Sequence, residues 1–457
     1  MHRAAAALIA ASVLAAGCSG GSRPTPIGQS NRPEPSGPSA SPTASPTASA
    51  VAQWPTYHGS NSRAGVASGP VLSKLRVAAS VRLDAAAYAQ PIVAVGLVIV
   101  ATENDTVYGI RPASHTIAWR THLATATRRS DLPCGNIDPS GITGTPAYDG
   151  STGSVFVVTE SGDAHHTLVA VDARSGAVRW RRDLDILGNR DRHAEQQRGA
   201  LLVQNGRVYV PFGGRFGDCG NYVGYLASVP VTGNGVVSTY AVPTAREAGM
   251  WAAPGPVVGP GGDIYVASGN GAELGGNYDG SDSVIRLTSS LHKVALFAPS
   301  SWAQDNADDL DLGSMSPAVV GDKLVIAGKR GTVYLLSSSL GGVGGQLATL
   351  SGCAAYGGAA VTANVVVLPC NDGLRAVAVS GNQMHWLWRA SGTMGSPIVC
   401  RDVLYAFDGS SLVELSLSGR VLHRVHVGDV TRFTTPVPVG NSVVVATTSH
   451  VVFVAAT

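Results

Sequence analysis

The sequence predicts an all-β protein, specifically an eight-bladed β-propeller with four-stranded blades. Three observations lead to this fold class. A strand–turn–strand pattern recurs along the chain, which indicates a repeat architecture. Charged residues make up only 14% of the 457 residues and glycine occurs 56 times, a composition typical of many short strands joined by tight turns. An isolated strand near the start of the repeats matches a strand that is missing at the end of the chain.

The recurring pattern is clearest in Leu168–Leu184, which reads LVAVDARSGAVRWRRDL. The apolar run Leu168–Asp172 predicts a short buried strand, and Ala173–Gly176 predicts a turn whose glycine takes a positive φ. The chain then returns as a second strand that carries Trp180 and two arginines. Weaker copies of the pattern occur at Val107–Leu123, Val284–Ala298, Val333–Leu350, Leu374–Ala390 and Leu412–Val427.

Each repeat begins with a lead-in segment of small residues before an apolar strand. Eight lead-in segments predict eight blades; they begin at Gln90, Gly144, Arg198, Ala253, Ser316, Gly358, Ser396 and Thr435. The eighth repeat ends after about three strands, and Leu75–Leu83 resembles the closing strand of a repeat. Pairing these two ends would close the ring and remove both exposed edges. A seven-bladed ring is the alternative, because the third repeat is degenerate.

The first 53 residues are predicted to be an export signal and a tether. Residues 1–17 form a basic start and an apolar run too short to span a bilayer comfortably. Their end, Leu14-Ala15-Ala16-Gly17-Cys18, resembles a bacterial lipoprotein cleavage box, which implies that Cys18 becomes a diacylglyceryl-modified N-terminus. An ordinary secretory signal with an incidental cysteine is the alternative. Residues 18–53 are rich in Ser, Pro, Thr and Ala and predict a disordered linker before a propeller at 54–457.

The remaining five cysteines agree with export to an oxidising compartment. Cys353 and Cys370 flank a strand pair within one repeat and are candidates for a disulfide, and Cys134 with Cys219 is a second candidate pair. Cys400 would then be a free buried thiol that acts as a small core residue. No Cys-x-x-Cys motif or Cys/His cluster supports a zinc site.

The net charge argues against a nucleic-acid-binding protein, and the positions of His165 and His166 argue against a histidine metal site. A net charge of +2 gives no reason to expect nucleic acid as a partner, and the basic residues are expected to form a solvated surface. The adjacent His165 and His166 are not expected to form a metal pair, because neighbouring side chains on a strand point to opposite faces.

The repeats resemble the blade motif of the pyrroloquinoline-quinone (PQQ) enzyme-like propellers. The resemblance rests on VYGI…AW, on LVAVDARSGAVRW, and on the opening Trp54-Pro55-Thr56-Tyr57-His58-Gly59 followed by Arg63, and it covers essentially all of residues 54–457. It implies that Trp119, Trp180 and Trp388 pack between neighbouring blades. The motif specifies a fold more strongly than a function, because one propeller serves many roles.

The same resemblance implies candidate site residues. In the quinoprotein dehydrogenases of this family, a tryptophan lies under the cofactor ring and an asparagine in a Gly-Asn turn binds calcium; Trp251 and Asn270 are the matching residues. Asp308, in DNADDLDLG, is the nearest match to the catalytic base, and Lys329 matches the basic residue that touches the quinone. Asp218 is an approximate replacement for the glutamate expected at the calcium.

The sequence also departs from the dehydrogenase pattern. It has no Cys-Cys pair to cover the quinone and no Cys-x-x-Cys-His motif for an electron-accepting haem. Simpler structural roles also exist for each candidate. Trp251 would be a packing residue and Asn270 a left-handed turn residue, Lys329 and Arg330 would be exposed, and Asp305–Asp311 would be a solvated loop or structural calcium site.

Three functional classes follow from these observations. We expect a non-catalytic, membrane-anchored propeller that binds an envelope protein or glycan, that works as a monomer and carries no resident cofactor. The family has such scaffold members, including the assembly lipoprotein of the outer-membrane barrel machinery. The alternatives are a PQQ- and calcium-dependent alcohol or sugar dehydrogenase, and a small-molecule or carbohydrate sensor that uses the central funnel with the loops Gly213–Tyr222 and Gly269–Asp282.

Overall fold

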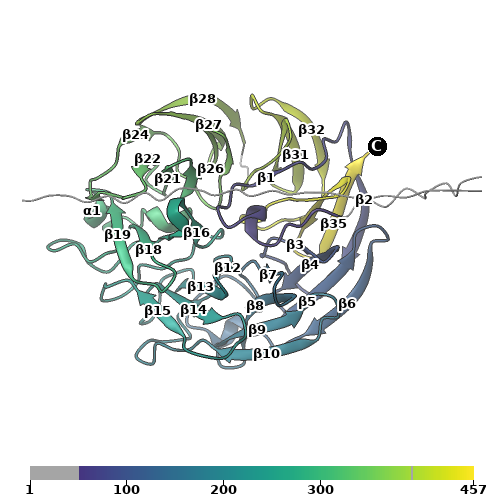
Figure 1. The fold of residues 1–457 in the computed structure, drawn as a ribbon, viewed down its shortest axis with the longest axis horizontal. Coiled ribbons are helices and arrows are strands. Elements are labelled where there is room, and N and C mark those ends of the chain that lie inside the picture. Colours follow the sequence, from purple (N-terminus) through teal and green to yellow (C-terminus); the bar gives the residue numbers. More distant parts are fainter. Residues whose placement is uncertain (1–50, 393–394) are drawn as a thin grey trace, which may run out of the picture. The chain divides into compact units, whose positions relative to one another are not determined.

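The structure, a computed structural model, describes residues 51–392 and 395–457. The export signal, Cys18 and nearly all of the linker lie outside the described residues. Within them the chain forms eight sheets arranged as the blades of one ring, and the four strands of each blade pair antiparallel (Figure 1). The prediction of an eight-bladed propeller is confirmed.

The first four blades follow the order of the chain, each with its innermost strand first. Their strands are β3 (Ile92–Ala94), β4 (Leu97–Thr102), β5 (Thr106–Arg111) and β6 (Thr116–His122); β7 (Ala147–Asp149), β8 (Ser154–Ser161), β9 (His165–Asp172) and β10 (Val178–Asp183); β12 (Leu202–Gln204), β13 (Arg207–Gly214), β14 (Tyr225–Pro230) and β15 (Ser238–Ala241); and β16 (Val257–Val258), β17 (Ile264–Ala267), β18 (Val284–Leu287) and β19 (Lys293–Ala298). The third blade is complete, so the seven-bladed alternative is wrong.

The next three blades repeat this arrangement. Their strands are β20 (Ala318–Val320), β21 (Lys323–Ala327), β22 (Thr332–Ser337) and β24 (Ala348–Ser351); β25 (Ala360–Thr362), β26 (Val365–Cys370), β27 (Gly373–Ser380) and β28 (Gln383–Ser391); and β29 (Ile398–Cys400), β30 (Val403–Asp408), β31 (Ser411–Ser416) and β32 (Val421–His426). Three short strands extend existing sheets: β1 (Val66–Ala67) beside β29, β11 (Glu195–Gln196) beside β13, and β23 (Gly342–Val343) beside β19.

The eighth blade joins the two ends of the propeller, as the sequence predicts. It contains β33 (Val437–Val439), β34 (Ser442–Ala446) and β35 (His450–Ala456), and its outermost strand is β2 (Leu75–Arg82). β2 pairs antiparallel with β35 from Leu75 opposite Ala456 to Arg82 opposite His450, and the purple β2 runs beside the yellow β35 in Figure 1. This pairing supplies backbone partners to two strands that would otherwise be edges.

The apolar core lies between successive blades. The cluster between the first and second blades, for example, combines Ile99 and Val107 with Val155 and Val169. Both faces of each blade are covered by its neighbours, so the middle strands are apolar runs rather than alternating ones. The outermost strands, such as β10, are largely exposed. In the part of the chain that the structure describes, helical structure is limited to α1 (Trp302–Ala307) and to the 3₁₀ turns η1 (Tyr57–Gly59), η2 (Arg129–Asp131), η3 (Pro260–Gly262) and η4 (Leu312–Ser314). None of these helices is long and apolar enough to cross a membrane.

The three motif tryptophans pack between blades, as the resemblance implies. Trp119 on β6 contacts the turn of the second blade, where its indole nitrogen donates to Ala173 O at 3.2 Å. A Cβ at Gly176 in that turn would lie 2.5 Å from the Trp119 ring, so this position requires glycine as well as a positive φ of 75°. Trp180 and Trp388 make the equivalent close contact with a glycine of the next blade.

Residues 54–67, here called the plug segment, occupy the centre of the ring (Figure 1, purple). Backbone hydrogen bonds join the segment to innermost strands around the ring: Trp54 to Val93, Pro55 to Tyr148, Ala64 to Val361 and Gly65 to Val399. The buried Arg63 guanidinium donates to Leu201 O at 2.9 Å and to Pro256 O at 3.3 Å. The plug segment therefore fills the channel at the level of the innermost strands.

Candidate functional site

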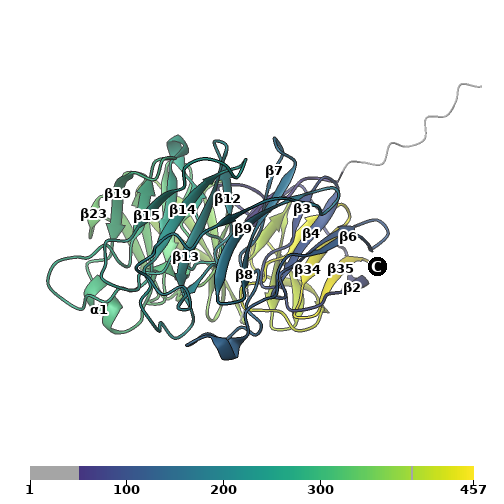
Figure 2. The same cartoon turned by 90° about the horizontal axis from the view of Figure 1, so that it is seen from below.

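A central cavity of about 790 Å³ lies at the axis of the ring. Its walls come from lead-in segments of several blades and from the loops that follow β13 and β17. Figure 2 shows the blades of the ring from the side. The side chains that carry charge or an aromatic ring are Tyr88, Arg198, Arg215, Phe216, Asp218, Tyr222, Trp251, Asp309, Asp311, Lys329, Tyr356, Arg432 and Phe433.

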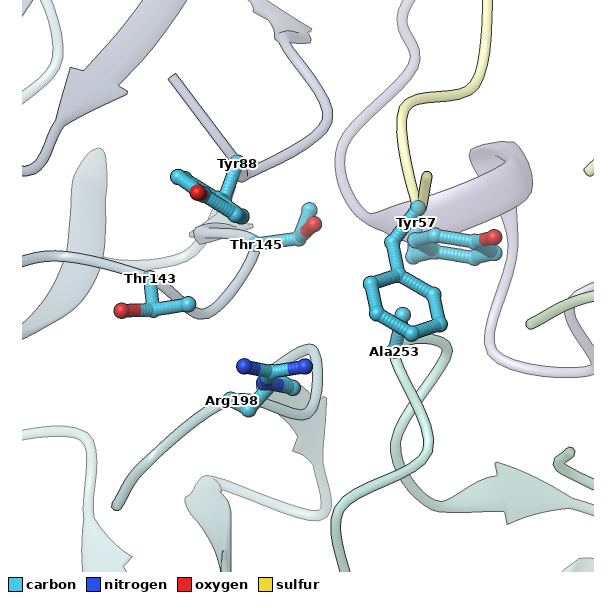
Figure 3. A pocket seen from close by; sticks show the side chains of 7 residues that line it. Tyr57, Tyr88, Thr143, Thr145, Arg198 and Ala253 are labelled. Atoms are coloured by element: carbon cyan, nitrogen blue, oxygen red, sulfur yellow. The ribbon is translucent and has the colours of Figure 1, made fainter. Parts of the chain in front are cut away.

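The repeat places equivalent positions at the inner end of this cavity. A residue four positions before the innermost strand lines the axis in six blades: Tyr88 before Ile92, Thr143 before Ala147, Arg198 before Leu202, Ala253 before Val257, Tyr356 before Ala360 and Phe433 before Val437. Five of these side chains converge with Tyr57 of the plug segment and Thr145 on a small pocket of about 10 Å³ (Figure 3). Tyr88, Arg198 and Phe433 line both spaces, so the cavity ends against the plug segment.

Three of the predicted residues meet around one carboxylate, that of Asp311. The indole nitrogen of Trp251 donates to Asp311 Oδ1 at 3.3 Å, and the backbone N–H of Asn270 donates to the same atom at 2.9 Å. With its amide oriented to satisfy its hydrogen bonds, Asn270 Nδ2 also donates to Oδ1 at 2.8 Å. The Lys329 ammonium forms an ion pair with Oδ2 and a second one, at 2.6 Å, with Asp309.

Asp308, the predicted base, does not belong to this cluster. Asp308 follows the last residue of α1, is exposed, and accepts a hydrogen bond of 2.7 Å from Gln304 of the same helix. The chain then takes a left-handed conformation at Asp309, with φ of 54°, and brings Asp311 into the cavity. The acidic residue of the cluster is therefore Asp311, three positions after Asp308, the residue that the family resemblance indicated.

Asp218 lines the same cavity but binds within its own loop. It accepts a hydrogen bond of 2.5 Å from the hydroxyl group of Tyr222. Burial raises the pKa of Asp218, and the negative charge of Asp311 raises it further.

Lys329 remains charged. Burial alone would lower its pKa, but the charge and hydrogen bonds of Asp311 and Asp309 outweigh burial and hold the pKa above its usual value. Its ammonium group lies 5.7 Å from the centre of the Trp251 ring. The ion pair with Asp311 is therefore a fixed feature of the cavity wall.

These donors suit calcium poorly. Calcium takes six to eight oxygen ligands, commonly with several carboxylates among them. Here Asp311 is neutralised by Lys329, the Asn270 amide turns its nitrogen toward Asp311, and Asp218 is bound to Tyr222. Within residues 51–392 and 395–457 no cluster of three or more His, Cys, Asp or Glu side chains is arranged to hold a metal.

Two arginines that the sequence did not single out as site residues lie on aromatic rings in the cavity. The Arg198 guanidinium is 5.3 Å from the centre of the Phe433 ring, and the Arg432 guanidinium is 3.9 Å from that of Tyr356. Arg198 is predicted only as the start of a lead-in segment. Its equivalence to the other lead-in positions is the signal that could have identified it.

Both candidate disulfides are present, and both adjoin the cavity. Cys134 bonds to Cys219, next to the cavity residues Gly217 and Asp218. Cys353 bonds to Cys370 and holds the loop that carries Tyr356. Cys400 is a free, buried thiol, and burial raises its pKa to about 12.

Comparison with known proteins supports the fold. Residues 67–274 match the family model described as outer membrane protein assembly factor BamB. No curated protein sequence matches the chain significantly.

Solved structures of two kinds are similar to the chain. Quinohemoprotein alcohol dehydrogenase from Comamonas testosteroni aligns with a TM-score of 0.69 and 14% identity, over 88% of this chain and 80% of that one. A europium-containing methanol dehydrogenase aligns with a TM-score of 0.68 and 14% identity, over 88% and 97%. BamB from Moraxella catarrhalis aligns with a TM-score of 0.55 and 18% identity, over 83% and 97%. The chain is therefore an eight-bladed β-propeller in which residues 67–274 are similar to that family, and the solved structures that share its fold include both dehydrogenases and an assembly factor.

Proposed function

We propose that this protein is a non-catalytic binding protein of the cell envelope that holds its ligand in the central cavity. The observation that carries this proposal is the state of Asp311. Its carboxylate lies where the acidic segment enters the cavity, yet it is paired with the Lys329 ammonium and accepts hydrogen bonds from Trp251 and Asn270.

The contacts of Asp311 leave its carboxylate little room to approach a substrate proton. General-base catalysis requires a carboxylate that can take a proton from the substrate, and a pKa near the working pH serves this best. Trp251 and Asn270 already donate to Oδ1 of Asp311, and Lys329 pairs with Oδ2, so neither oxygen is free to accept a proton from a substrate. The donor set also offers calcium little, so the cavity supports recognition better than oxidation.

The location in the envelope is proposed from the N-terminal sequence. The cleavage box before Cys18 supports a lipid anchor on the extracytoplasmic side of the membrane, and residues 18–53 would act as its linker. The two disulfides suit an oxidising compartment. Cys18→Ala should release the protein from the membrane fraction; a Cys18→Ala protein that stays in that fraction would argue against the lipid anchor.

The catalytic alternative can be tested directly. Purified full-length protein would be incubated with PQQ and calcium, and reduction of an artificial electron acceptor would be followed over a panel of alcohols and sugars. We expect no turnover, with an authentic quinoprotein dehydrogenase as the positive control. Calcium-dependent turnover that disappears in Asp311→Asn would overturn the proposal and establish the dehydrogenase.

The binding role calls for a second experiment. Mild crosslinking in the native envelope should capture an envelope protein or a glycan. Shortening the loop Gly269–Asp282 should reduce this capture. An unchanged yield with the shortened loop would place the contact elsewhere on the propeller.

A further inference from the structure

We infer that the central cavity binds the end of an acidic sugar chain, with Arg198 and Arg432 as the residues that hold its carboxylate or phosphate group. This inference rests on the proposed function and names the chemical class of the ligand. It follows from the charge pairing, the aromatic rings and the closed inner end of the cavity.

Four basic side chains line the cavity, and they fall into two pairs. Arg215 is buried and bonded to Glu160 at 2.6 Å, and Lys329 is paired with Asp309 and Asp311. Arg198 and Arg432 form no ion pair with any residue that the structure describes. Only this second pair has its charge available for a ligand.

Arg198 lies deep in the cavity without a counter-ion. Its only hydrogen bond among the described residues is a long one, 3.4 Å, to Gln196 Oε1. The carboxyl group that acts on Arg198 is that of Glu103, and burial raises the pKa of Glu103 to about 8. The Glu103 carboxyl group accepts its hydrogen bonds from the Gly141 N–H and the Thr143 hydroxyl group rather than from Arg198. A desolvated guanidinium without an anion is costly, and an anionic ligand would relieve that cost.

Arg432 extends the same chemistry toward the mouth of the cavity. Its guanidinium stacks on Tyr356 and donates to Asn371 Oδ1, an uncharged acceptor. Stacking holds the planar group in place, so less freedom is lost when it binds a carboxylate or phosphate through two parallel hydrogen bonds.

The rest of the wall suits a sugar. Trp251 lies among aromatic rings, with its centre 6.4 Å from that of Tyr356 and 6.3 Å from that of Phe433. Aromatic faces pack against the C–H faces of sugar rings, and the amides and hydroxyls of Asn136, Thr431 and Thr448 can bond to sugar hydroxyls. The cavity volume falls within the range typical of small-molecule sites.

The plug segment explains why a chain end is expected. Tyr57 stands at the inner end of the cavity, and the plug segment fills the channel beyond it. A linear glycan therefore cannot thread through the ring and must enter by its terminus.

Isothermal titration of the full-length protein tests the inference. The probes are trigalacturonate, maltotriose as a neutral trisaccharide of equal length, glucose 6-phosphate and PQQ. We expect trigalacturonate or the sugar phosphate to bind at least ten times more tightly than maltotriose, with an affinity that falls as salt is raised. The stronger of the two acidic probes identifies the group, carboxylate or phosphate.

Arginine variants complete the test. Arg198→Gln and Arg432→Gln should each weaken binding of the acidic probe at least tenfold. Arg182→Gln is the matched control, because Arg182 lies outside the cavity on β10 and its guanidinium donates to the Gly235 carbonyl. Unfolding temperatures would show that each variant is folded, and the exposed position of Arg432 makes its variant the safer one.

The outcomes separate the two proposals. Three results overturn the inference: equal affinity for acidic and neutral sugars, loss of affinity in the Arg182 variant alone, or no binding of any sugar. In each case an envelope protein becomes the expected ligand of the propeller. Tighter binding of PQQ than of either acidic sugar also overturns the inference. Only turnover with PQQ and calcium would overturn the proposed function itself.

Discussion

Removing the Lys329 ammonium should destabilise the propeller more than removing any surface lysine. Lys329 and Lys323 are matched in exposure, since both are 18% exposed, and each pairs with an aspartate; Lys329 pairs in addition with the exposed Asp309. Their partners differ: Asp311 is 3% exposed, whereas Asp322 is 81% exposed. The comparison therefore isolates the burial of the carboxylate.

The expected loss for Lys329→Met can be worked out from the contacts. Breaking a buried ion pair from one side costs about 3–5 kcal/mol, because the remaining charge is buried without a partner. Asp311 keeps its bonds from Trp251 and from the Asn270 backbone, and solvent partly screens the lysine. We therefore expect a loss of about 2–4 kcal/mol in the free energy of unfolding.

Urea unfolding of both variants at pH 7, followed by tryptophan fluorescence, is the assay. Lys323→Met should leave the midpoint almost unchanged, because its partner Asp322 is 81% exposed and water screens the pair. Equal losses for the two lysine variants would refute the view that Lys329 neutralises a buried carboxylate.

Three further predictions concern the frame around the cavity. Gly176→Ala should lower the free energy of unfolding by about 1–3 kcal/mol more than Gly162→Ala, because both glycines have positive φ but only Gly176 meets an indole ring; equal urea midpoints would contradict this. Replacing both Cys134 and Cys219 by Ser should cost about 4–5 kcal/mol on the chain-entropy model, since this disulfide spans 85 residues, and an unchanged midpoint would mean that the disulfide adds no stability. Burial lowers the pKa of His166, but its two carboxylate partners outweigh burial and raise the pKa to about 9. The stability that the charged imidazole contributes is therefore complete below a pH of about 6.5 and is lost as the pH rises through about 9. His166→Gln should be most destabilising in acid, and a loss of stability that is independent of pH would contradict this reasoning.

The fold could be predicted because its signals are local. Every blade has the same hairpin, and a strand that is buried on both faces is apolar throughout. The strand–turn–strand pattern can therefore be recognised in each repeat separately. The closing strand Leu75–Arg82 was predictable for a related reason: when each end of a repeat array leaves an unpaired strand, pairing the two strands removes both exposed edges.

The candidate site was predictable only in outline. Trp251, Asn270 and Lys329 were found because they lie in segments that resemble a known family. The resemblance pointed to Asp308 rather than Asp311, because an acidic run in the sequence does not show where a short helix ends. That helix turns Asp308 outward, and the left-handed residue after it directs Asp311 inward.

The sequence by itself determined the repeat, the number of blades, the closure of the ring and the cysteine pairs. Only the tertiary structure decided which cations of the cavity are paired and which are free. Arg198 and Arg432 are separated by most of the propeller sequence, and each has an ordinary local context. Whether such charges find a partner depends on which lead-in segments face each other across the axis, and ring closure alone sets that arrangement.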